Sequence, residues 1–291
     1  MQPEMDKKPW GAKTRLEFIE QRLYWEGRLR RSDLTDCFDI STQQASGDIS
    51  DYQQIAPQNI QYNKNDKYYC ITDNFKPVLI RPDSEWYLFQ LLSASKSDSE
   101  TVRQRWSAAF DVVPIPKRTI NPEFLRSILS AIRGRLSIKI RYQSLSKPEP
   151  IWRQVSPHAL AFDGNRWHVR AYCHRENKFK DFAASRVFEV AETQPSAIEP
   201  QQDQAWHRVI NIQIGPAPEL AEGQRRSIEL DYGMSEGRLE IPTRVALASY
   251  LIRQLRLEGG EQENRPGSRR QIVILNRSEI EAAQRECGCI K

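Results

Sequence analysis

Four side chains between residues 42 and 46 have the chemistry to hydrogen-bond to nucleic-acid bases. Thr42, Gln43, Gln44 and Ser46 carry hydroxyl and amide groups, and they are small enough to reach base edges in a major groove. Basic side chains nearby in the sequence could bind backbone phosphate. The basic residues in question are Arg31, Lys64 and Lys67.

Three helical patterns must position these residues. The first covers residues 12–30, a second short helix follows a predicted Ser32 cap, and a third follows a predicted Ser41 cap. Their inner faces are formed by Leu16, Ile19, Leu23, Leu34, Phe38, Ala45, Ile49 and Tyr52. The other faces of the first helix carry Lys13, Arg15, Glu17, Glu20 and Arg22. With an alternating hairpin over residues 60–71, the pattern predicts a winged helix-turn-helix.

These residues alone leave the role of the segment open. Gly47 costs a helix about 1 kcal/mol relative to Ala, so it indicates either close approach to a DNA backbone or a tolerated surface glycine. Helical triplets with a hairpin also occur in domains that never bind DNA.

A second group of polar residues lies in the middle of the chain. Residues 81–200 carry 19 Lys and Arg against 13 Asp and Glu, whereas residues 1–80 carry 11 against 12. In the predicted strand 166–173, alternation places Trp167, Val169, Ala171 and Cys173 on a core face and Arg166, His168, Arg170 and Tyr172 on an exposed face. The pattern therefore predicts a cationic surface on this strand.

The elements around this strand predict an α+β multidomain protein. Helices are expected at 84–92 and 124–133, and a strong turn at Asp163-Gly164. Strands are expected at 136–142, 151–155, 158–162, 166–173, 179–182 and 186–190, which together favour a small bent sheet or barrel. The last third predicts a strand at Ile210, Ile212 and Ile214, a helix through Val245, Ala248, Leu251, Ile252 and Leu255, a loop at 259–270 and a strand at 271–275.

The chain accordingly divides into a winged helix-turn-helix at 1–80, a helical connector at 81–118, a sheet domain at 119–195 and an α+β C-terminal domain at 196–291. Five scattered cysteines predict reduced thiols, and Cys287-Gly288-Cys289 is interpreted as a tail. Without a long apolar run we expect no membrane association and a soluble, cytoplasmic protein.

Several segments together resemble the WYL-domain transcriptional regulators of bacteria, and most of all the BrxR/CapW-type repressors of phage-defence operons. The similarity is carried by residues 40–46, 142–144, 155–160, 166–173, 181–182 and 185–187. One departure is that the name-giving Trp-Tyr-Leu reads Trp167-His168-Val169 here. The resemblance implies an N-terminal winged helix, a central WYL domain with an Sm-like β-barrel, and a C-terminal extension domain that, with the connector, supports a homodimer.

The resemblance also implies a function. We expect a repressor, not an enzyme, that binds an inverted-repeat operator, including its own promoter, as a homodimer. It implies a ligand sensor as well, so we expect an anionic, nucleotide-like or oligonucleotide effector and no other cofactor. The residues that match the sensor positions are Tyr142, Ser144, Arg153, His158, His168, Arg170 and Arg186. An alternative is that these arginines pair with Glu149, Asp181 or Glu189 and only stabilise the fold.

Two other functions remain open. The first is an RNA or single-strand binder in which Tyr62, Tyr68 and Trp152 stack on bases. The second is an enzyme or metal site built from His158, His168, Cys173 and His174. No catalytic or metal-binding motif spacing accompanies these four residues, so no catalytic residue and no metal ligand is predicted.

Overall fold

The computed structural model describes residues 10–95, 109–116, 118–258 and 271–290. It forms two compact units, residues 1–115 and residues 116–291, and each is described by itself. The loop predicted at 259–270 lies outside the described residues. None of the described helices is both long and apolar enough to cross a bilayer.

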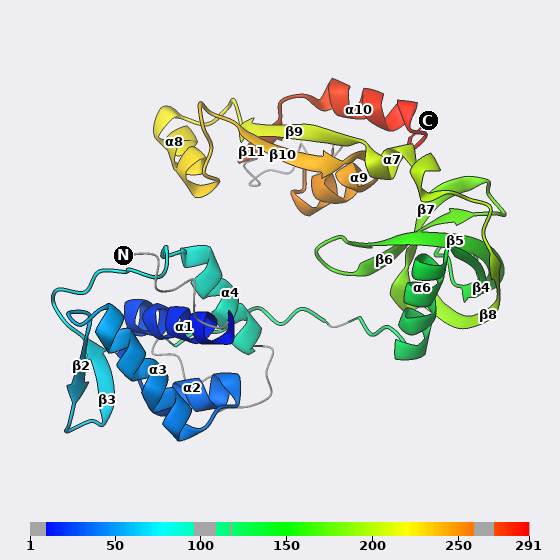
Figure 1. Cartoon of the computed structure of the whole chain (residues 1–291). Helices are drawn as coiled ribbons and strands as arrows, with labels where there is room; N and C mark the ends of the chain where they lie inside the picture. The colour runs from blue at the N-terminus through cyan, green and yellow to red at the C-terminus, as the bar shows by residue number, and fades with distance from the viewer. Residues whose placement is uncertain (1–9, 96–108, 117, 259–270, 291) are drawn as a thin grey trace. The chain divides into compact units, whose positions relative to one another are not determined.

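The first unit is a helical triplet with a three-stranded sheet (Figure 1). Its elements are α1 (Trp10–Glu26), β1 (Arg28–Leu29), α2 (Arg31–Phe38), α3 (Thr42–Ile55), β2 (Ile60–Asn63), β3 (Tyr68–Ile71) and α4 (Ser84–Ser95). The strands pair antiparallel in the order β1-β3-β2. The predicted inner faces of the three helices are confirmed, because Leu16, Ile19, Leu23, Leu34, Ala45 and Tyr52 are fully buried in one cluster.

Two expectations for this unit are wrong. Ser32 does not cap α2: the helix begins at Arg31, and its first turn is held by the Asp33 carboxylate, which accepts from the Arg30 N–H at 2.8 Å. Glu20 and Arg22 are buried, not on open faces of α1. The Glu20 carboxylate accepts the N–H groups of residues 78, 79 and 80 at 3.0, 2.6 and 2.8 Å, so it anchors the chain that follows the hairpin.

The helix α4 packs against α1 by an aromatic contact. The rings of Trp25 and Tyr87 stack with centroids 4.9 Å apart, and the Tyr87 hydroxyl donates to Glu26 at 2.7 Å. Burial and this carboxylate raise the pKa of Tyr87 to about 12. On its outer side, Leu88, Phe89 and Leu92 are exposed. The winged helix therefore continues into α4, which retains an apolar surface.

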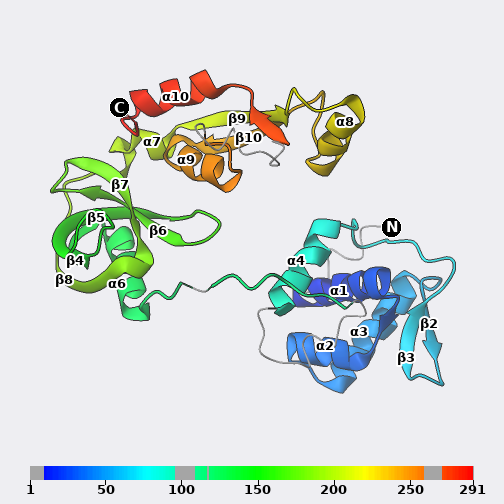
Figure 2. The same ribbon diagram turned by 180° about the vertical axis from the view of Figure 1, so that it is seen from behind.

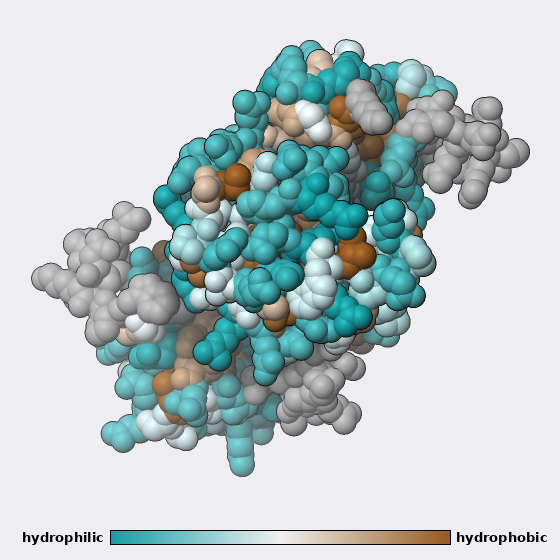
Figure 3. All heavy atoms as spheres, turned by 90° about the vertical axis from the view of Figure 1, so that its right-hand side faces the viewer, coloured by the Kyte–Doolittle hydropathy of each residue, from teal (hydrophilic) through white to brown (hydrophobic). Residues whose placement is uncertain are grey.

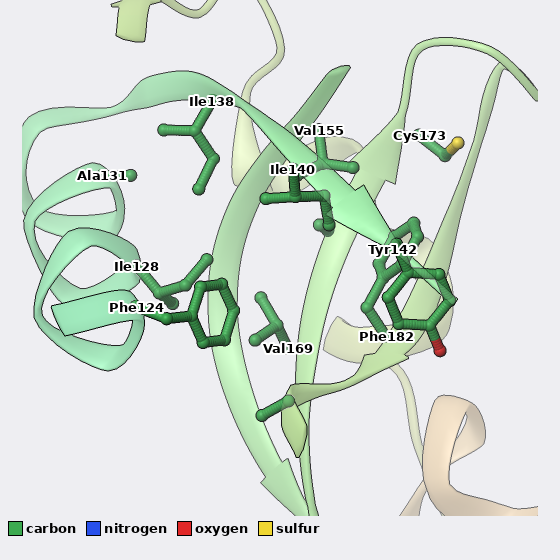
Figure 4. Packing of buried hydrophobic residues seen from close by; sticks show 12 residues of the cluster. Phe124, Ile128, Ala131, Ile138, Ile140, Tyr142, Val155, Val169, Cys173 and Phe182 are labelled. Atoms are coloured by element: carbon green, nitrogen blue, oxygen red, sulfur yellow. The ribbon is translucent and has the colours of Figure 1, made fainter. Parts of the chain in front are cut away.

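The second unit begins with α6 (Pro122–Gly134), capped by Asn121, and a five-stranded antiparallel sheet. The strands are β4 (Leu136–Tyr142), β5 (Ile151–Phe162), β6 (Trp167–Cys173), β7 (Lys178–Ala183) and β8 (Val187–Pro195). Their order is β7-β6-β5-β4-β8, and in the described chain the edge strands β7 and β8 do not pair, so the sheet is open. Figure 4 shows Phe124, Ile128 and Ala131 of α6 facing Ile138, Ile140, Val155 and Val169 of the sheet.

The strands expected at 151–155 and 158–162 are a single long strand. The register between β5 and β6 shifts between Pro157 and Ala159, which marks a bulge. Proline has no N–H to donate to a ladder, so a bulge accommodates it without ending the strand. The turn predicted at Asp163-Gly164 is confirmed, with Gly164 at a φ of 90°.

The C-terminal part of this unit has its own sheet, in the order β10-β9-β11 (Figure 2). Its elements are α7 (Gln204–His207), β9 (Val209–Pro216), α8 (Glu222–Asp231), β10 (Leu239–Arg244), α9 (Val245–Gln254), β11 (Ile272–Ile274) and α10 (Arg277–Glu286). The predicted strand, helix and strand are confirmed as β9, α9 and β11. The strand β10 and helices α8 and α10 were not predicted.

The apolar side of α9 is used within its own domain. Ala248 is fully buried beside Ile212 and Ile214 of β9, and Leu251, Ile252 and Leu255 pack against the same cluster. The helix is therefore a core element.

Figure 3, which looks at the side of the five-stranded sheet, shows a mostly hydrophilic face with scattered hydrophobic residues.

Candidate functional site

The helix α3 presents the polar residues singled out in the sequence. The Ser41 hydroxyl accepts from the Gln44 N–H at 3.1 Å, which confirms the predicted cap. Ala45, Ile49 and Tyr52 fix the inner face of α3, and this leaves Thr42, Gln43 and Gln44 exposed in its first turn.

A partly buried ion pair holds α3 against α1. Arg15 donates to both oxygens of Asp48, at 2.6 Å from Nε and 3.1 Å from Nη2, and Asp48 is 2 % exposed. The hydrogen bond to Asp48 raises the pKa of Arg15. The Gln44 amide also donates to Asp48, at 3.1 Å. The exposed amide of Gln44 is thus oriented by a rigid partner.

The remaining polar side chains of α3 differ in whether they are free to bind DNA. The side chain of Gln43 makes no hydrogen bond among the described residues, so its amide oxygen and its NH2 group are both free to bind a base. Ser46 is half-buried, and its hydroxyl donates to the Thr42 carbonyl at 2.9 Å. A methyl group added at Gly47 would meet open space, so local packing does not require glycine there.

The predicted phosphate-binding residues are all exposed. Arg31 is the first residue of α2, and Lys64 and Lys67 lie in the β2–β3 turn, with Lys67 at a φ of 55°. Asn63 organises this turn, because its side-chain oxygen accepts the N–H groups of Asn65 and Asp66 at 3.0 and 3.2 Å.

The predicted cationic face of β6 is buried and neutralised. His168 and Arg170 are only 6 % and 5 % exposed, whereas Trp167, expected in the core, is 48 % exposed. The reason is long-range: this side of β6 is covered by Tyr250 of α9 and by Asp203, which precedes α7. The expectation of an exposed cationic strand is therefore wrong.

Arg170 is bound by two carboxylates. Its Nε and Nη2 donate to Asp203 at 2.7 and 3.0 Å, and its Nη1 donates to Asp181 at 3.3 Å. Burial lowers the pKa of Arg170, but these carboxylates outweigh burial and raise it. Asp203 also accepts from His158 Nε2 at 2.9 Å. Burial alone would raise the pKa of Asp203, yet the donors His158 and Arg170 lower it to about 2.

Other residues that were predicted to contact the ligand also have hydrogen-bond partners within the protein. Arg153 is buried and paired with Glu176, and His168 Nε2 donates to Asp163 at 2.8 Å. The Tyr142 hydroxyl accepts the Ala183 N–H at 3.3 Å, and the Ser144 and Ser146 hydroxyls are hydrogen-bonded at 2.8 Å.

The structure brings only some of the predicted ligand-binding residues together. Tyr142, His168 and Arg186 line one cavity of about 590 Å³. Arg170 lines a second cavity of about 790 Å³, and His158 lines a narrow gap beside α6. The first cavity also contains Arg166, which was predicted only as part of the cationic strand face, and Arg253 and Arg256, which were not predicted. Arg253 lies near the end of α9 and Arg256 lies just beyond it. In the sequence, the only signal for these two residues was the spacing of three between one arginine and the next.

The residues of the metal-site alternative are separated by their partners. His158 contacts Asp203, His168 contacts Asp163, and His174 contacts Ser156 at 2.8 Å. Across the described ranges, no three His, Cys, Asp or Glu side chains are grouped to hold a metal ion.

Comparison with family models defines the class of protein. Residues 11–93 match the BrxR transcriptional regulator winged helix-turn-helix domain. Residues 123–192 match the WYL domain, and residues 209–280 match the BrxR transcriptional regulator C-terminal dimerization domain. The chain is thus a three-part WYL-domain regulator with an N-terminal winged helix.

Curated relatives extend over nearly the whole chain. Three proteins described as DNA-binding transcriptional repressor CapW are similar to it. The protein of Stenotrophomonas maltophilia is 38% identical over 281 residues, 95% of this chain and 93% of the relative. The protein of Pseudomonas aeruginosa is 39% identical over 273 residues, 93% and 91% of the two chains. The protein of Escherichia coli (strain KTE188) is 36% identical over 275 residues, 94% and 92% of the two chains. The chain belongs to the CapW/BrxR family of WYL-domain regulators.

Proposed function

We propose that this protein is a transcriptional repressor that recognises operator DNA through α3. The observation that carries the proposal is the exposed first turn of α3, where Gln43 is free and Gln44 is oriented by the buried Asp48. Amide side chains of this kind bind adenine through two hydrogen bonds in the major groove. The exposed Arg31, Lys64 and Lys67 supply phosphate contacts on either side of the helix.

The protein acts as a homodimer on an inverted repeat. The match of residues 209–280 to a dimerization domain supports this, since a two-fold dimer presents two α3 helices to two half-sites. The exposed Leu88, Phe89 and Leu92 of α4 offer a further apolar contact between copies. Acting on chromosomal DNA, the protein works in the cytoplasm.

The genes controlled include a phage-defence operon and the protein's own promoter. This part rests on the resemblance of the chain to repressors of such operons, while the names of its relatives support only the role of a DNA-binding transcriptional repressor.

An anionic, nucleotide-like effector bound by the WYL domain modulates DNA affinity. Tyr142, His168 and Arg186 meet in one cavity and support this role, while contacts from Ser144, Arg153, His158 and Arg170 remain a prediction. The order β7-β6-β5-β4-β8 after a preceding helix supports an Sm-like arrangement of the domain.

Mapping the DNA protected by the full chain in its own upstream region tests the proposal. We expect protection of two half-sites related by a two-fold axis, with centres about 10 base pairs apart or a multiple of that spacing. Competition with single-stranded DNA and RNA tests the alternative, in which the exposed Trp152 and Tyr62 stack on unpaired bases. Preference for the unpaired competitors would contradict the proposal.

A further inference from the structure

The end of α10 holds two cysteines on either side of one glycine. Cys287 is the C-terminal cap of the helix, and Gly288 follows it at a φ of 66°. The Gly288 N–H donates to the Arg285 carbonyl at 2.9 Å, and the Cys289 N–H donates to the Gln284 carbonyl at 2.8 Å. These two bonds around a left-handed glycine form a Schellman motif. The segment interpreted from the sequence as a tail is thus a defined turn.

This turn keeps the two cysteines within reach of a disulfide bond. Because Gly288 folds the chain back, the Cα atoms of Cys287 and Cys289, which are two steps of about 3.8 Å apart along the chain, lie within the limit of about 7 Å for a disulfide. A disulfide across a single residue closes a small ring, and strain of that kind makes the bond easier to reduce. Strained and exposed disulfides are typical of labile, regulatory pairs.

A cation lies beside the first of the two thiols. Arg208, which precedes β9, donates to the Glu286 carboxylate. This hydrogen bond contributes most to raising the pKa of Arg208, and the neighbouring Cys287 adds to the rise. A guanidinium beside a thiol favours the thiolate, which is the nucleophile in thiol chemistry. The position of Arg208 therefore suits Cys287 to the attacking role.

The second thiol has different surroundings. Cys289 is an exposed residue, but its thiol is partly covered. Burial raises the pKa of this thiol, Arg170 opposes the rise, and the neighbouring Cys287 adds to it. A thiol that stays protonated suits the resolving role, in which it reacts only with an oxidised partner.

Small molecules can reach this turn. Cys287, Gly288 and Cys289 all line the cavity of about 790 Å³ that Arg170 also lines. A cavity of this volume readily admits a molecule of the size of hydrogen peroxide. Exposure and thiolate character are the two properties that make a cysteine susceptible to oxidation.

We propose that Cys287 and Cys289 are a modification site for peroxides, a reversible dithiol–disulfide pair in which Cys287 attacks and Cys289 resolves. The inference concerns chemistry at the end of α10 and goes beyond the proposed recognition of DNA.

The reaction balances without any other reactant. The Cys287 thiolate attacks one oxygen of hydrogen peroxide, the O–O bond breaks, and the other oxygen leaves as hydroxide, which takes up the thiol proton to become water. Cys287 is then a sulfenic acid. The Cys289 thiol attacks its sulfur, the S–O bond breaks, and a second water leaves. The two thiols are oxidised to one disulfide, and the peroxide is reduced to two waters. A dithiol reductant reverses the oxidation by exchange.

The pair lies where α10 meets its neighbours (Figure 1). Cys287 packs against a small cluster formed by Ala205 of α7, Val245 of α9 and Ala283 of α10. A disulfide would replace the Cys287 thiol at the edge of this cluster. Oxidation therefore changes the surface that the end of α10 presents to α7 and α9.

Peroxide treatment of the reduced full chain, followed by alkylation and mass spectrometry, tests the pair. Trypsin cleaves after Arg285, so both cysteines lie in one peptide, residues 286–291, that contains no other cysteine. With a small excess of hydrogen peroxide, we expect this peptide to lose two hydrogen atoms and to take up no alkyl group. Reduction with dithiothreitol before alkylation should restore two alkylated thiols.

A trivalent arsenical tests the same geometry without an oxidant. Phenylarsine oxide binds where two thiols can bridge its arsenic atom, so we expect the wild type to bind a single equivalent. Cys287→Ser and Cys289→Ser should each abolish this binding. The matched control is Cys37→Ser, because Cys37 is an exposed cysteine on α2, and its loss should leave the binding intact.

Reaction rates test the assigned roles. Arg208→Gln should slow disulfide formation about threefold or more, because it removes the cation beside Cys287. The control is Arg141→Gln, whose pair with Glu189 is similarly exposed but lies on the five-stranded sheet, and which should leave the rate unchanged.

Three results would overturn the inference: both cysteines remain open to alkylation after peroxide treatment, Cys287 advances to a sulfinic acid while Cys289 is still alkylated, or the only disulfide formed joins two chains. Equal rates for the two arginine variants would overturn the assignment of Cys287 as the attacking thiol.

Discussion

Arg170 of β6 and Asp203, the residue that caps α7, are joined by two hydrogen bonds of 2.7 and 3.0 Å, and both side chains are almost fully buried. The pair links the WYL sheet to the C-terminal part of the same unit. Because Asp181 and His158 share the same cluster, each charge in it has an opposite or hydrogen-bonding neighbour. This arrangement is expected of a structural contact between domains.

Asp203→Asn should lower the free energy of unfolding of residues 116–291 by about 3 kcal/mol or more, because it leaves the Arg170 guanidinium buried with weaker compensation. Urea unfolding followed by circular dichroism measures the change. The matched control is Glu199→Gln, whose pair with Arg135 is exposed and should contribute under about 1 kcal/mol. Equal effects of the two substitutions would show that the buried pair has no special role.

The same carboxylate predicts a pH dependence. The donors His158 and Arg170 lower the pKa of Asp203 to about 2, below the unfolded value of about 3.9. A depressed folded-state pKa stabilises above the unfolded pKa, so this contribution is complete above about pH 4 and is lost as the pH falls toward 2. Unfolding midpoints measured from pH 6 to pH 2 should fall less steeply for Asp203→Asn than for the wild type. Parallel curves would contradict this assignment.

Ser41→Ala tests the cap that orients the first turn of α3. Losing the hydrogen bond to the Gln44 N–H should cost about 1 kcal/mol of unfolding free energy in residues 1–115. Ser50→Ala, at an exposed position inside the same helix, should be neutral or slightly stabilising. The account of the cap fails if both variants behave alike.

Removing residues 1–80 should leave a dimer. The truncated chain keeps the exposed apolar side of α4 and the residues matched to a dimerization domain. Sedimentation at micromolar concentration distinguishes the states. A monomer would show that the winged helix supplies the essential dimer contact.

Local pattern predicted the winged helix well because its signals are short-range. The spacing of Leu16, Ile19 and Leu23 defines one face of α1, and Ser41 lies directly before its helix. The burial of Glu20 could not be predicted in this way. Its partners are backbone N–H groups 58 to 60 residues away, which no local pattern reveals.

The candidate effector site shows the same limit. Alternation correctly placed His168 and Arg170 on one side of β6, but it could not show that Tyr250 and Asp203 cover that side. Alternation along a strand predicts the side of the sheet on which a side chain lies. Whether that side is buried depends on the segments of the chain that pack against it. For the same reason Arg253 and Arg256 were missed: only the fold brings α9 beside Arg186.

The measurement that tests the central claim most directly compares binding of the wild type, Gln43→Ala and Lys64→Ala to the mapped operator and to scrambled duplex DNA. Gln43→Ala should lose about 1–3 kcal/mol on the operator and much less on scrambled DNA, because it removes a base contact. Lys64→Ala should weaken both equally and reduce the salt dependence, because it removes a phosphate contact. Equal losses on both DNAs for Gln43→Ala would contradict base recognition by α3.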